Sequence, residues 1–476
     1  MTENELFRDF IIISIPRTCR PLRYVVATLF AFCLFFLFGT AQAQVQSANG
    51  FDVLHYAAGV VPALQARTVR GNEQITVQAT QNDVKVLRFD SGSLVIDAIR
   101  QGGEKLRFKK VGSRLDIQLP AVLDSGDRTT VEITYHEAPT HGMEFHPEVS
   151  EVYTIFATSQ WLVCIDSPSE RATLDLRVTL PAGFKAIGNG RLVSRSVLKN
   201  KKLVYHWRQD VPVSSFAYGF AAGKFNEVQT RQSGIRLRFL SHDLSAAQLR
   251  KVFHDTGDIL KFFGSKAGIP YRGSYSQALV AKTIGQEYAG FAVLSEAYGK
   301  HVLKHPGGVF LIAHEAAHQW WGIGVTCRSW RDFWLNEGFA NFMAAAYIKH
   351  RYGDKAYRQI IADWRQDVQD LRRLGKDHAL VFKSWSHPTK FDRAVVYKKG
   401  AYVLYLLKSK LGGKAFWKGI RFYTHKYWGK SVAAKDFEKA MEKSTGRDLG
   451  TFFQKWVYGA TLGAPVTTST SIAEVF

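Results

Sequence analysis

Two histidines one helical turn apart, followed by a glutamate at a set distance, constrain the fold of this chain more than any other feature. The stretch begins His314-Glu315-Ala-Ala-His318, and on an α-helix the two imidazoles lie on one face, where they can share a metal ion. Eighteen residues separate His318 from Glu337 in Trp-Leu-Asn-Glu-Gly. That interval has room for a helix exit at Gly322, a connector and a second helix that returns a carboxylate. The spacing therefore predicts two helices packed against each other.

Two histidines and one glutamate are the ligand set of a catalytic zinc, because they leave the fourth tetrahedral position open. We therefore expect one Zn²⁺ per chain, held by His314, His318 and Glu337. Glu315 lies about 100° round the helix from His314, so it can reach a metal-activated water without being a ligand. The alternative is two surface or core histidines that bind no metal. The Asn-Glu-Gly-Phe-Ala segment at this spacing favours the metal.

Length, composition and charge indicate a folded protein of two domains. The 476 residues exceed what one core usually supports, and 46% hydrophobic with 22% charged residues is a globular balance, neither disordered nor fibrous. The net charge of +22 could attract nucleic acid or anionic membrane. However, the Lys and Arg residues are scattered and no aromatic-basic motif accompanies them. We therefore expect a solvated basic surface and no nucleic-acid partner.

Residues 1–43 have the features of a secretory signal peptide. Three arginines between residues 17 and 23 precede an apolar run, Tyr24 to Phe38, and an A-x-A sequence ends at Ala43. The run is shorter than the roughly 20 residues that a bilayer span needs, although an uncleaved anchor is the alternative. Cleavage after Ala43 predicts export across the inner membrane to the periplasm or medium, with no stable membrane span afterwards. Only Cys164 and Cys327 would remain, so no disulfide framework is expected.

The hydrophobic period changes from two to 3.6 near residue 240. Between about residues 45 and 239, β-branched stretches such as 130–135 and 173–180 alternate with turns, which predicts a large β-sandwich or saddle. Later segments predict helices at 246–263, 357–374, 396–411, 414–427, 433–444 and 449–458, with a short strand at 277–281. We expect an α+β protein with a signal peptide at 1–43, a β domain at 44–240, a mainly helical domain at 241–462 and a loose tail at 463–476.

Further motifs in the same order, over roughly residues 50 to 460, resemble the aminopeptidase N family of zinc peptidases in the gluzincin clan. They are Cys-Ile-Asp-Ser-Pro at 164–168, Gly-Gln-Glu-Tyr-Ala-Gly at 285–290, Tyr-Lys-Lys-Gly-Ala at 397–401 and Phe-Phe-Gln-Lys-Trp at 452–456. The resemblance implies that the helical domain is a thermolysin-like zinc peptidase. It also implies a secreted zinc aminopeptidase that hydrolyses N-terminal residues from peptides by means of a metal-activated water.

The same resemblance assigns roles to further residues. Segment 285–290 is similar to the family's G-x-M-E-N substrate loop, which implies that Glu287 binds the free α-ammonium of a peptide. An internal peptide segment has no cation for such a buried carboxylate, so Glu287 favours exopeptidase action. Gly285 and Gly290 suit a loop whose backbone approaches the substrate. Tyr397 is expected to donate its hydroxyl to the tetrahedral oxyanion. The alternatives for Glu287 and Tyr397 are a surface glutamate and a core tyrosine.

Two departures from the family pattern leave the first substrate pocket open. Tyr288, which we expect to contact the substrate, stands where the family has Asn, and Gln286 stands where it has Met, so the preferred N-terminal residue is not predicted. Many family members add a C-terminal helical domain over the active site, whereas this sequence stops about where the catalytic domain should end. We therefore expect an open cleft, or closure of the cleft by another chain. A zinc metalloendopeptidase and a non-catalytic peptide-binding protein on the same fold stay as alternative functions. The oligomeric state is not predicted.

Overall fold

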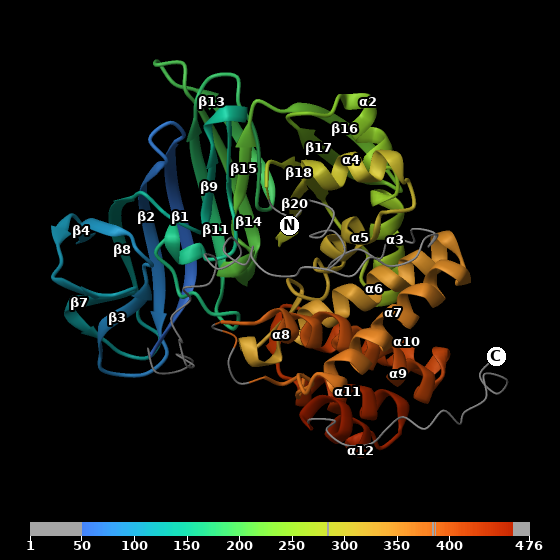
Figure 1. The fold of residues 1–476 in the computed structure, drawn as a ribbon. Coiled ribbons are helices and arrows are strands. Elements are labelled where there is room, and N and C mark those ends of the chain that lie inside the picture. Colours follow the sequence, from blue (N-terminus) through green and yellow to red (C-terminus); the bar gives the residue numbers. More distant parts are fainter. Residues whose placement is uncertain (1–49, 283–284, 383–384, 386, 460–476) are drawn as a thin grey trace.

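The protein consists of a β-rich N-terminal half and a mainly helical C-terminal half (Figure 1). The structure, a computed structural model, describes residues 50–282, 285–382, 385 and 387–459. The predicted signal peptide at 1–43 and the predicted tail at 463–476 lie outside these residues. The α+β fold class, with a β domain that precedes a helical one, is confirmed.

Eight strands form the largest sheet of the N-terminal half, and all neighbours are antiparallel except β1 and β11. In sheet order they are β13 (Arg191–Val197), β14 (Leu203–Ser214), β11 (Arg171–Leu180), β1 (Phe51–Ala63), β2 (Thr68–Ala79), β8 (Arg128–Glu137), β4 (Val95–Gln101) and β5 (Glu104–Lys105). Burial alternates along the strands: in β2, Ile75 and Val77 are buried while Gln74 is exposed. Alternation of this kind packs one face of a sheet inward.

Two smaller antiparallel sheets pack with the large one. One contains, in order, β3 (Val84–Asp90), β7 (Arg114–Leu123) and β6 (Phe108–Val111). The other contains β12 (Lys185–Gly188), β15 (Phe220–Gly223), β10 (Glu151–Thr154) and β9 (Met143–His146). Buried side chains from all three sheets, among them Val53, Phe89 and Phe220, belong to one hydrophobic core. This shared core makes the N-terminal half a single packing unit.

A five-stranded sheet opens the C-terminal half. Its order is β16 (Asn226–Gln232), β17 (Ile235–Ser241), β18 (Ser274–Val280), β20 (Phe291–Ser295) and β19 (Gly285–Tyr288). Strand β18 runs parallel to both β17 and β20, whereas β19 is antiparallel to β20 and lies at the edge. Because β16 and all but the last residue of β17 precede residue 241, this sheet begins before the predicted domain boundary.

Helices make up most of the remaining chain, and their side chains share one large core. They are α2 (Ala246–Val252), α3 (Thr256–Ala267), α4 (Glu296–Lys304), α5 (Phe310–Ala317), α6 (Trp334–Tyr352), α7 (Asp354–Arg373), α8 (Lys390–Ala394), α9 (Gly400–Leu411), α10 (Gly413–Tyr427), α11 (Ala434–Thr445) and α12 (Gly450–Phe453). Shorter elements are the 3₁₀ turns η1 (Pro147–Val149), η2 (Thr158–Gln160), η3 (Ser215–Ala217) and η4 (Trp330–Asp332), the π-helical segments η5 (Val395–Lys399) and η6 (Gln454–Tyr458), and the parallel pair β21 (Val325–Cys327) and β22 (Lys430–Val432). The segment predicted as one helix at 246–263 is two helices, α2 and α3.

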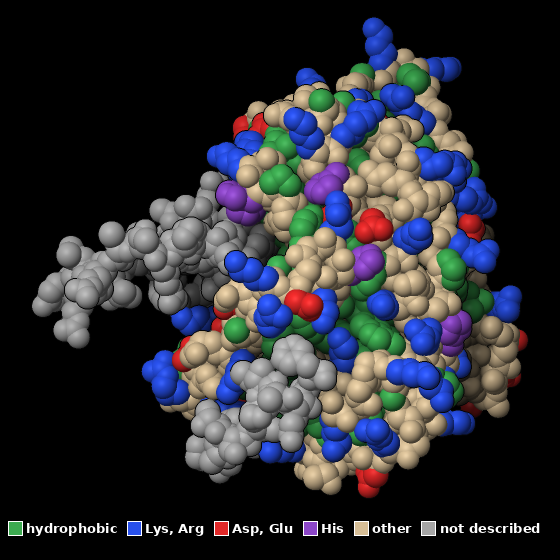
Figure 2. Space-filling model, turned by 90° about the vertical axis from the view of Figure 1, so that its right-hand side faces the viewer, with side chains coloured by type: hydrophobic (Ala, Val, Ile, Leu, Met, Phe, Trp, Pro, Cys, Tyr) green, Lys and Arg blue, Asp and Glu red, His purple; other side chains and the backbone are tan. Residues whose placement is uncertain are grey.

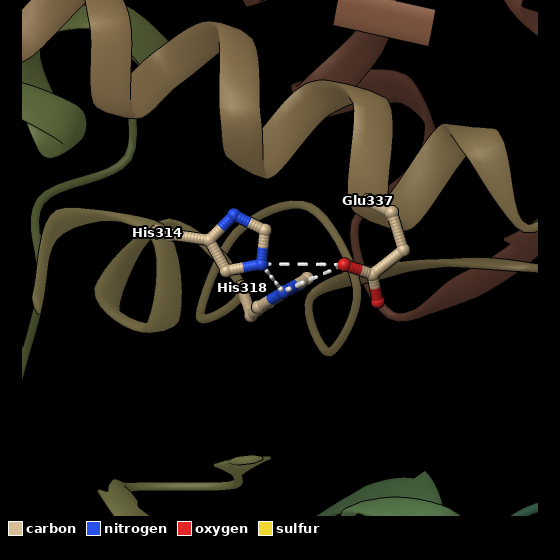
Figure 3. A group of neighbouring side chains, drawn as sticks. All are labelled: His314, His318 and Glu337. Carbon is tan, nitrogen blue, oxygen red and sulfur yellow. Dashed lines mark hydrogen bonds and ion pairs between the residues drawn. The ribbon is translucent and has the colours of Figure 1, made fainter. Parts of the chain in front are cut away.

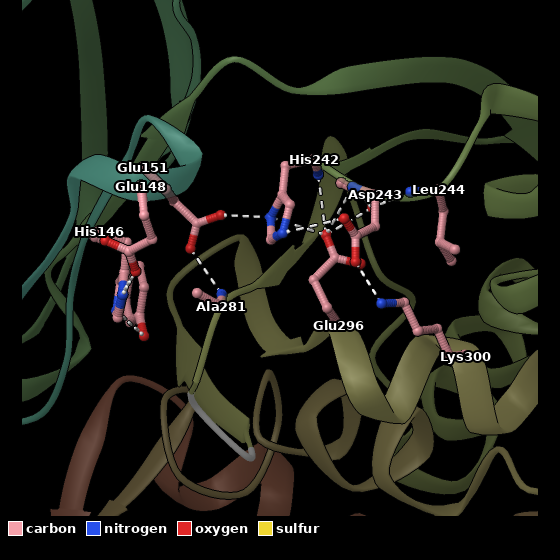
Figure 4. Close-up of polar contacts among 11 residues, drawn as sticks. His146, Glu148, Glu151, His242, Asp243, Leu244, Ala281, Glu296 and Lys300 are labelled. Atoms are coloured by element: carbon pink, nitrogen blue, oxygen red, sulfur yellow. Dashed lines mark hydrogen bonds and ion pairs between the residues drawn. The ribbon is translucent and has the colours of Figure 1, made fainter.

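A polar network joins the two halves beside the five-stranded sheet (Figure 4). Nδ1 of His242, directly after β17, lies 3.1 Å from Oε2 of Glu151 in β10 and 3.2 Å from Oε1 of Glu296 at the start of α4. Oε1 of Glu151 accepts the N–H of Ala281 at 2.8 Å. Both carboxylates are buried. The network therefore ties the β domain to the chain that leads from β18 into β19.

Exchange of His242 for glutamine is expected to lower the melting temperature more at acidic pH than at alkaline pH. The hydrogen bond to Glu151, offset by burial, raises the pKa of His242 above its ordinary 6.5. The charged imidazole therefore stabilises the fold fully below that pH, and this contribution is lost as the pH rises through the raised pKa.

Thermal melting of both proteins between about pH 5.5 and 9 checks this expectation. A difference of about 2–4 °C at the acidic end that narrows towards the alkaline end is expected. A difference that widens as the pH rises would contradict the assignment.

The surface of the described residues bears dispersed positive charge. Lys and Arg side chains are spread over the face shown in Figure 2, with few Asp or Glu among them.

None of the described helices is both long and apolar enough to span a bilayer. Cys164 and Cys327 are both buried free thiols.

Candidate active site

The three predicted metal ligands come from two helices that pack against each other. His314 lies in α5, His318 directly follows the last residue of α5, and Glu337 lies in the first turn of α6. All three side chains are buried. Nε2 of His314 is 3.1 Å from Nε2 of His318, and these two atoms lie 3.2 Å and 3.6 Å from Oε2 of Glu337 (Figure 3). The structure thus brings the predicted set together at one point.

The end of α5 shapes this arrangement. The predicted helix exit at Gly322 is too late, because α5 ends at Ala317 and the N–H of Trp320 bonds the carbonyl of Ala317, only three residues back. Gly322 then adopts φ +137°, a conformation that favours glycine. A Cβ at Gly322 would lie 2.7 Å from Nδ1 of His318. The turn after the helix therefore leaves room for the His318 ring only because residue 322 has no side chain.

The hydrogen-bond partners of the two Nδ1 atoms determine which tautomer each histidine adopts. Nδ1 of His318 lies 3.1 Å from the carbonyl oxygen of Trp321, which can only accept, so this nitrogen carries the proton. Nδ1 of His314 lies 2.9 Å from Oδ1 of Asn341 and is protonated for the same reason. The two Nε2 atoms and an oxygen of Glu337 lie within 4.8 Å of one another, and with a metal in place of the acidic proton their lone pairs would meet at one point. A donor set of this kind, with its outer ring nitrogens fixed, fits Zn²⁺.

The electrostatics of the pocket favour positive charge at the same point. Burial lowers the pKa of His318, but the nearby carboxylates of Glu287 and Glu337 outweigh it and raise the pKa to about 10. Burial raises the pKa of Glu337, yet the His318 charge prevails and lowers it to about 2. A divalent cation between these ligands would supply the positive charge that stabilises the nearby carboxylates.

Glu315 lies beside the ligand set without belonging to it. A carboxylate oxygen of Glu315 falls within 4.8 Å of ligand atoms of Glu287 and His318. A Cβ at Gly285 would be 2.2 Å from Oε1 of Glu315, so glycine at the start of β19 makes room for this carboxylate. Burial raises the pKa of Glu315 well above its ordinary value. The carboxyl group thus lies beside the ligand set, where it could take up and release a proton.

Glu287 projects from the edge strand β19 into the same pocket. The side chain is buried, and Nε2 of Gln286 donates a hydrogen bond to its Oε2 at 2.7 Å. Burial, opposed by the His318 charge, raises the pKa of Glu287 to about 7. Among the described residues, no strand pairs with the outer side of β19 in this sheet. An extended peptide could add there as a further strand, with its end at Glu287.

Tyr288 and Gly290 connect this loop to the rest of the molecule. The Tyr288 ring is fully buried and stacks on Phe291, and its hydroxyl donates to the carbonyl of Thr154 in β10. The structure therefore places this side chain at the contact with the β domain, and its predicted contact with substrate stays a prediction. Gly290 has φ +87°, and its N–H donates to Oε1 of Gln319 at 3.0 Å.

Gln319 and Asn341 are two site residues that the sequence reasoning missed. Nε2 of Gln319 donates to the carbonyl of Tyr288 at 2.9 Å, so Gln319 links the end of α5 to the segment 285–290. Asn341 orients His314 and lies four residues after Glu337 on α6. That helical spacing puts Asn341 and Glu337 on one face and could have revealed Asn341. No comparable pattern in the sequence marks Gln319.

Tyr397 lies in the π-helical segment η5, over the ring of His314. The two rings stack with centroids 6.1 Å apart and 12° between their planes, and Phe333 meets Tyr397 edge-on. Burial and the carboxylates of Glu337 and Glu287 raise the pKa of Tyr397 well above 10. The hydroxyl therefore keeps its proton near neutral pH and can donate a hydrogen bond.

Two segments of this chain match family models, and several known proteins are similar to it. Residues 53–217 match the family model of the peptidase M1 N-terminal domain, and residues 300–456 match that of the peptidase family M1 domain. Aminopeptidase N of Lactococcus lactis subsp. lactis is 27% identical over 435 residues, which cover 82% of this chain but only 49% of that protein. The chain thus spans about half the length of this relative.

Two further proteins cover more of their own length. Leucine aminopeptidase 2 of Ajellomyces capsulatus is 25% identical over 465 residues, which are 90% of this chain and 73% of that protein. A crystal structure of an M1 zinc metallopeptidase from Deinococcus radiodurans, a point mutant bound to a Tyr-Ser-Ala substrate, superposes with a TM-score of 0.76 at 23% identity. That match covers 87% of this chain and 96% of the other, which shows a shared fold.

Proposed function

The chain belongs to peptidase family M1, and we propose that it is a zinc-dependent aminopeptidase that removes N-terminal residues from peptides. One Zn²⁺ would be held by His314, His318 and Glu337, whose converging lone pairs fit it. Zinc, when bound, polarises a scissile carbonyl and makes the attacking water more acidic. The remaining work falls to side chains of this protein.

Three side chains carry the proposed reaction. Glu315 takes the proton of the attacking water and returns it to the departing amine. Tyr397 keeps its hydroxyl proton and donates it in a hydrogen bond to the oxygen that gains negative charge. Glu287 accepts the free α-ammonium of the substrate and so places the first peptide bond at the site. Glu315 is buried and lies beside His318 without belonging to the ligand set, a position that suits a group that passes a proton between these two steps.

One observation carries the choice of an aminopeptidase over an endopeptidase. The buried carboxylate of Glu287 lies within 4.8 Å of the ligand atoms of Glu315 and His318, so a cation held by Glu287 sits beside the cleaved bond. An endopeptidase substrate has no ammonium group there, and the carboxylate would stay buried without a partner cation. This geometry favours a substrate with a free N-terminus.

Exchange of Glu287 for glutamine is expected to remove the preference for a free amine. The native enzyme should cleave a fluorogenic amino-acid amide and leave its N-acetylated partner uncleaved. The Glu287→Gln variant should lose about 10²-fold in kcat/KM on the free amine, because a buried partner of a charged group is removed. Steady-state kinetics on both substrates, with the exposed Glu104→Gln as the matched control, measures this. Equal cleavage of the two substrates by the native enzyme would instead support the endopeptidase alternative.

The non-catalytic alternative, a peptide-binding protein on this fold, is tested by the same assays. A protein that holds stoichiometric zinc but cleaves no member of a peptide panel would support it. The buried Glu315 and the protonated Tyr397 beside the ligand set favour the enzyme.

We further propose that the protein is exported and acts in the periplasm or the medium. The basic flank, the apolar run from Tyr24 to Phe38 and the A-x-A sequence that ends at Ala43 support this proposal. Intact mass of the protein recovered from the periplasm or medium should correspond to a chain that begins at Gln44. A mature protein that retains residues 1–43 would contradict it.

A further inference from the structure

A buried ion pair lies two residues beyond Tyr397. Nζ of Lys399 is 2.5 Å from Oδ1 of Asp377 and 2.6 Å from the carbonyl oxygen of His378. The side chains of Lys399 and Asp377 are both 0% exposed. A lysine this deeply buried is rare unless its charge is paired, and here the partner comes from the loop between α7 and α8. The pair thus fixes one end of the segment that carries Tyr397 to a distant part of the chain.

The segment itself has an unusual backbone. Residues Val395–Lys399 form the π-helical turn η5 between α8 and α9, so one extra residue widens the turn. Such turns occur mostly at functional sites, where they redirect a side chain. Tyr397 is the middle residue of η5 and Lys399 is the last. Anchoring Lys399 therefore restricts the rotation and advance of the same turn that aims Tyr397.

The other side of this segment rests on the helix that carries a metal ligand. A Cβ at Gly400 would be 3.1 Å from Cα of Gly338, and a Cβ at Gly338 would be 3.0 Å from Cα of Gly400. The two backbones therefore touch, one residue after Glu337 on α6 and one residue after Lys399. Because the two backbones are in contact, η5 can move relative to α6 only by sliding or rolling along it. The Asp377–Lys399 ion pair opposes this movement.

The same loop also holds the start of the turn. Nε2 of His378 lies 2.9 Å from Oδ1 of Asp392 in α8, directly before η5. Residues 377 and 378 thus contact the chain on both sides of Tyr397. Oδ2 of Asp377 additionally faces Nε of Arg372 at 3.4 Å, near the end of α7.

We propose that the Asp377–Lys399 ion pair is a positioning device that holds the hydroxyl of Tyr397 at the reacting carbonyl. Asp377 and Lys399 are positioning residues, because neither belongs to the ligand set and both act through the turn η5. The proposal rests on the proposed function, in which Tyr397 donates to the oxyanion. It predicts that loss of the pair misplaces this donor, although the metal ligands and Glu287 stay where they are.

The test compares Lys399→Met with the double variant Asp377→Leu/Lys399→Met, which removes both charges and leaves no unpaired carboxylate in the core. We expect kcat to fall by about 10- to 100-fold in each, less than the 10²–10³ that complete loss of an oxyanion donor costs. KM should change by less than about threefold, since this donor acts on the transition state. Zinc content should stay stoichiometric, and Lys349→Met, whose exposed lysine pairs with Asp354 outside η5, should keep native kcat.

A Tyr397→Phe background separates positioning from a general structural effect. Adding Asp377→Leu/Lys399→Met to Tyr397→Phe should lower kcat no further, because the same interaction is already lost. If the loss in kcat caused by Asp377→Leu/Lys399→Met multiplied with the loss caused by Tyr397→Phe, the positioning role would be overturned. A folded double variant with native kcat would overturn it as well. In both cases the role of Tyr397 itself would stand. Native kcat in Tyr397→Phe itself would overturn the role of Tyr397 and the positioning role together.

Discussion

Glu315→Gln is expected to lower kcat by about 10³-fold and to leave the bound zinc in place, within the range that general acid–base catalysis contributes. The amide has the shape of the carboxyl group, so the space left by Gly285 still accommodates it. It cannot, however, take up the proton of the attacking water. Steady-state kinetics on a fluorogenic amino-acid amide, with zinc content measured on the same preparation, checks this result.

The matched control for Glu315→Gln is Glu132→Gln, an exposed position in β8. This variant should keep native kcat and native zinc content. A Glu315→Gln enzyme with kcat within about threefold of the native value would exclude Glu315 as the general base.

Removal of the metal is expected to abolish activity, and Glu337→Gln is expected to have nearly the same effect. Glu337 supplies the only carboxylate among the three converging ligand atoms, so its loss removes both a donor and a charge. Loss of more than about 10³-fold in activity, within the range that catalytic groups contribute, should follow dialysis against a chelator. Added Zn²⁺ should restore the chelated native enzyme but not Glu337→Gln, whereas Mg²⁺, which prefers oxygen ligands, should restore neither.

Asn341→Ala is the control for Glu337→Gln and should lower activity less. Asn341 contacts His314 but not the metal position, so its loss should weaken zinc affinity by about 10- to 100-fold without removing a ligand. Zinc in excess should then restore activity in Asn341→Ala. Full activity of zinc-free native enzyme would contradict the role of the metal.

The ligand set could be predicted because it rests on local periodicity. His314 and His318 are one turn apart, and the segment around Glu337 follows at a distance that a second helix can bridge, and in the structure these residues lie together. The strands of the β domain were predictable for the same reason, since apolar residues such as Ile75 and Val77 alternate with polar ones along each strand. The change of period near residue 240 predicted the order of the two domains, and the family resemblance, which the comparisons confirm, identified the helical one as a peptidase.

Other features depend on contacts between distant parts of the chain, which periodicity does not record. Strand β17 alternates like the strands before it, yet it pairs with β18 in the sheet of the catalytic half. Lys399 reads as one more residue of an amphipathic helix, but its partner Asp377 comes from a loop 22 positions earlier. The π-helical turn η5 also lacks a local signal, because its residues suit an α-helix equally well. Tyr288, predicted to lie at the substrate, is placed by its hydrogen bond to Thr154 in the other half.

The most direct test of the central claim is diffraction from crystals of the zinc-loaded enzyme, recorded on both sides of the zinc absorption edge. The account predicts one anomalous peak per chain, about 2.0–2.2 Å from Nε2 of His314, Nε2 of His318 and a carboxylate oxygen of Glu337. A zinc-loaded crystal with no peak between these three residues, or with its zinc bound by a different set of side chains, would contradict it.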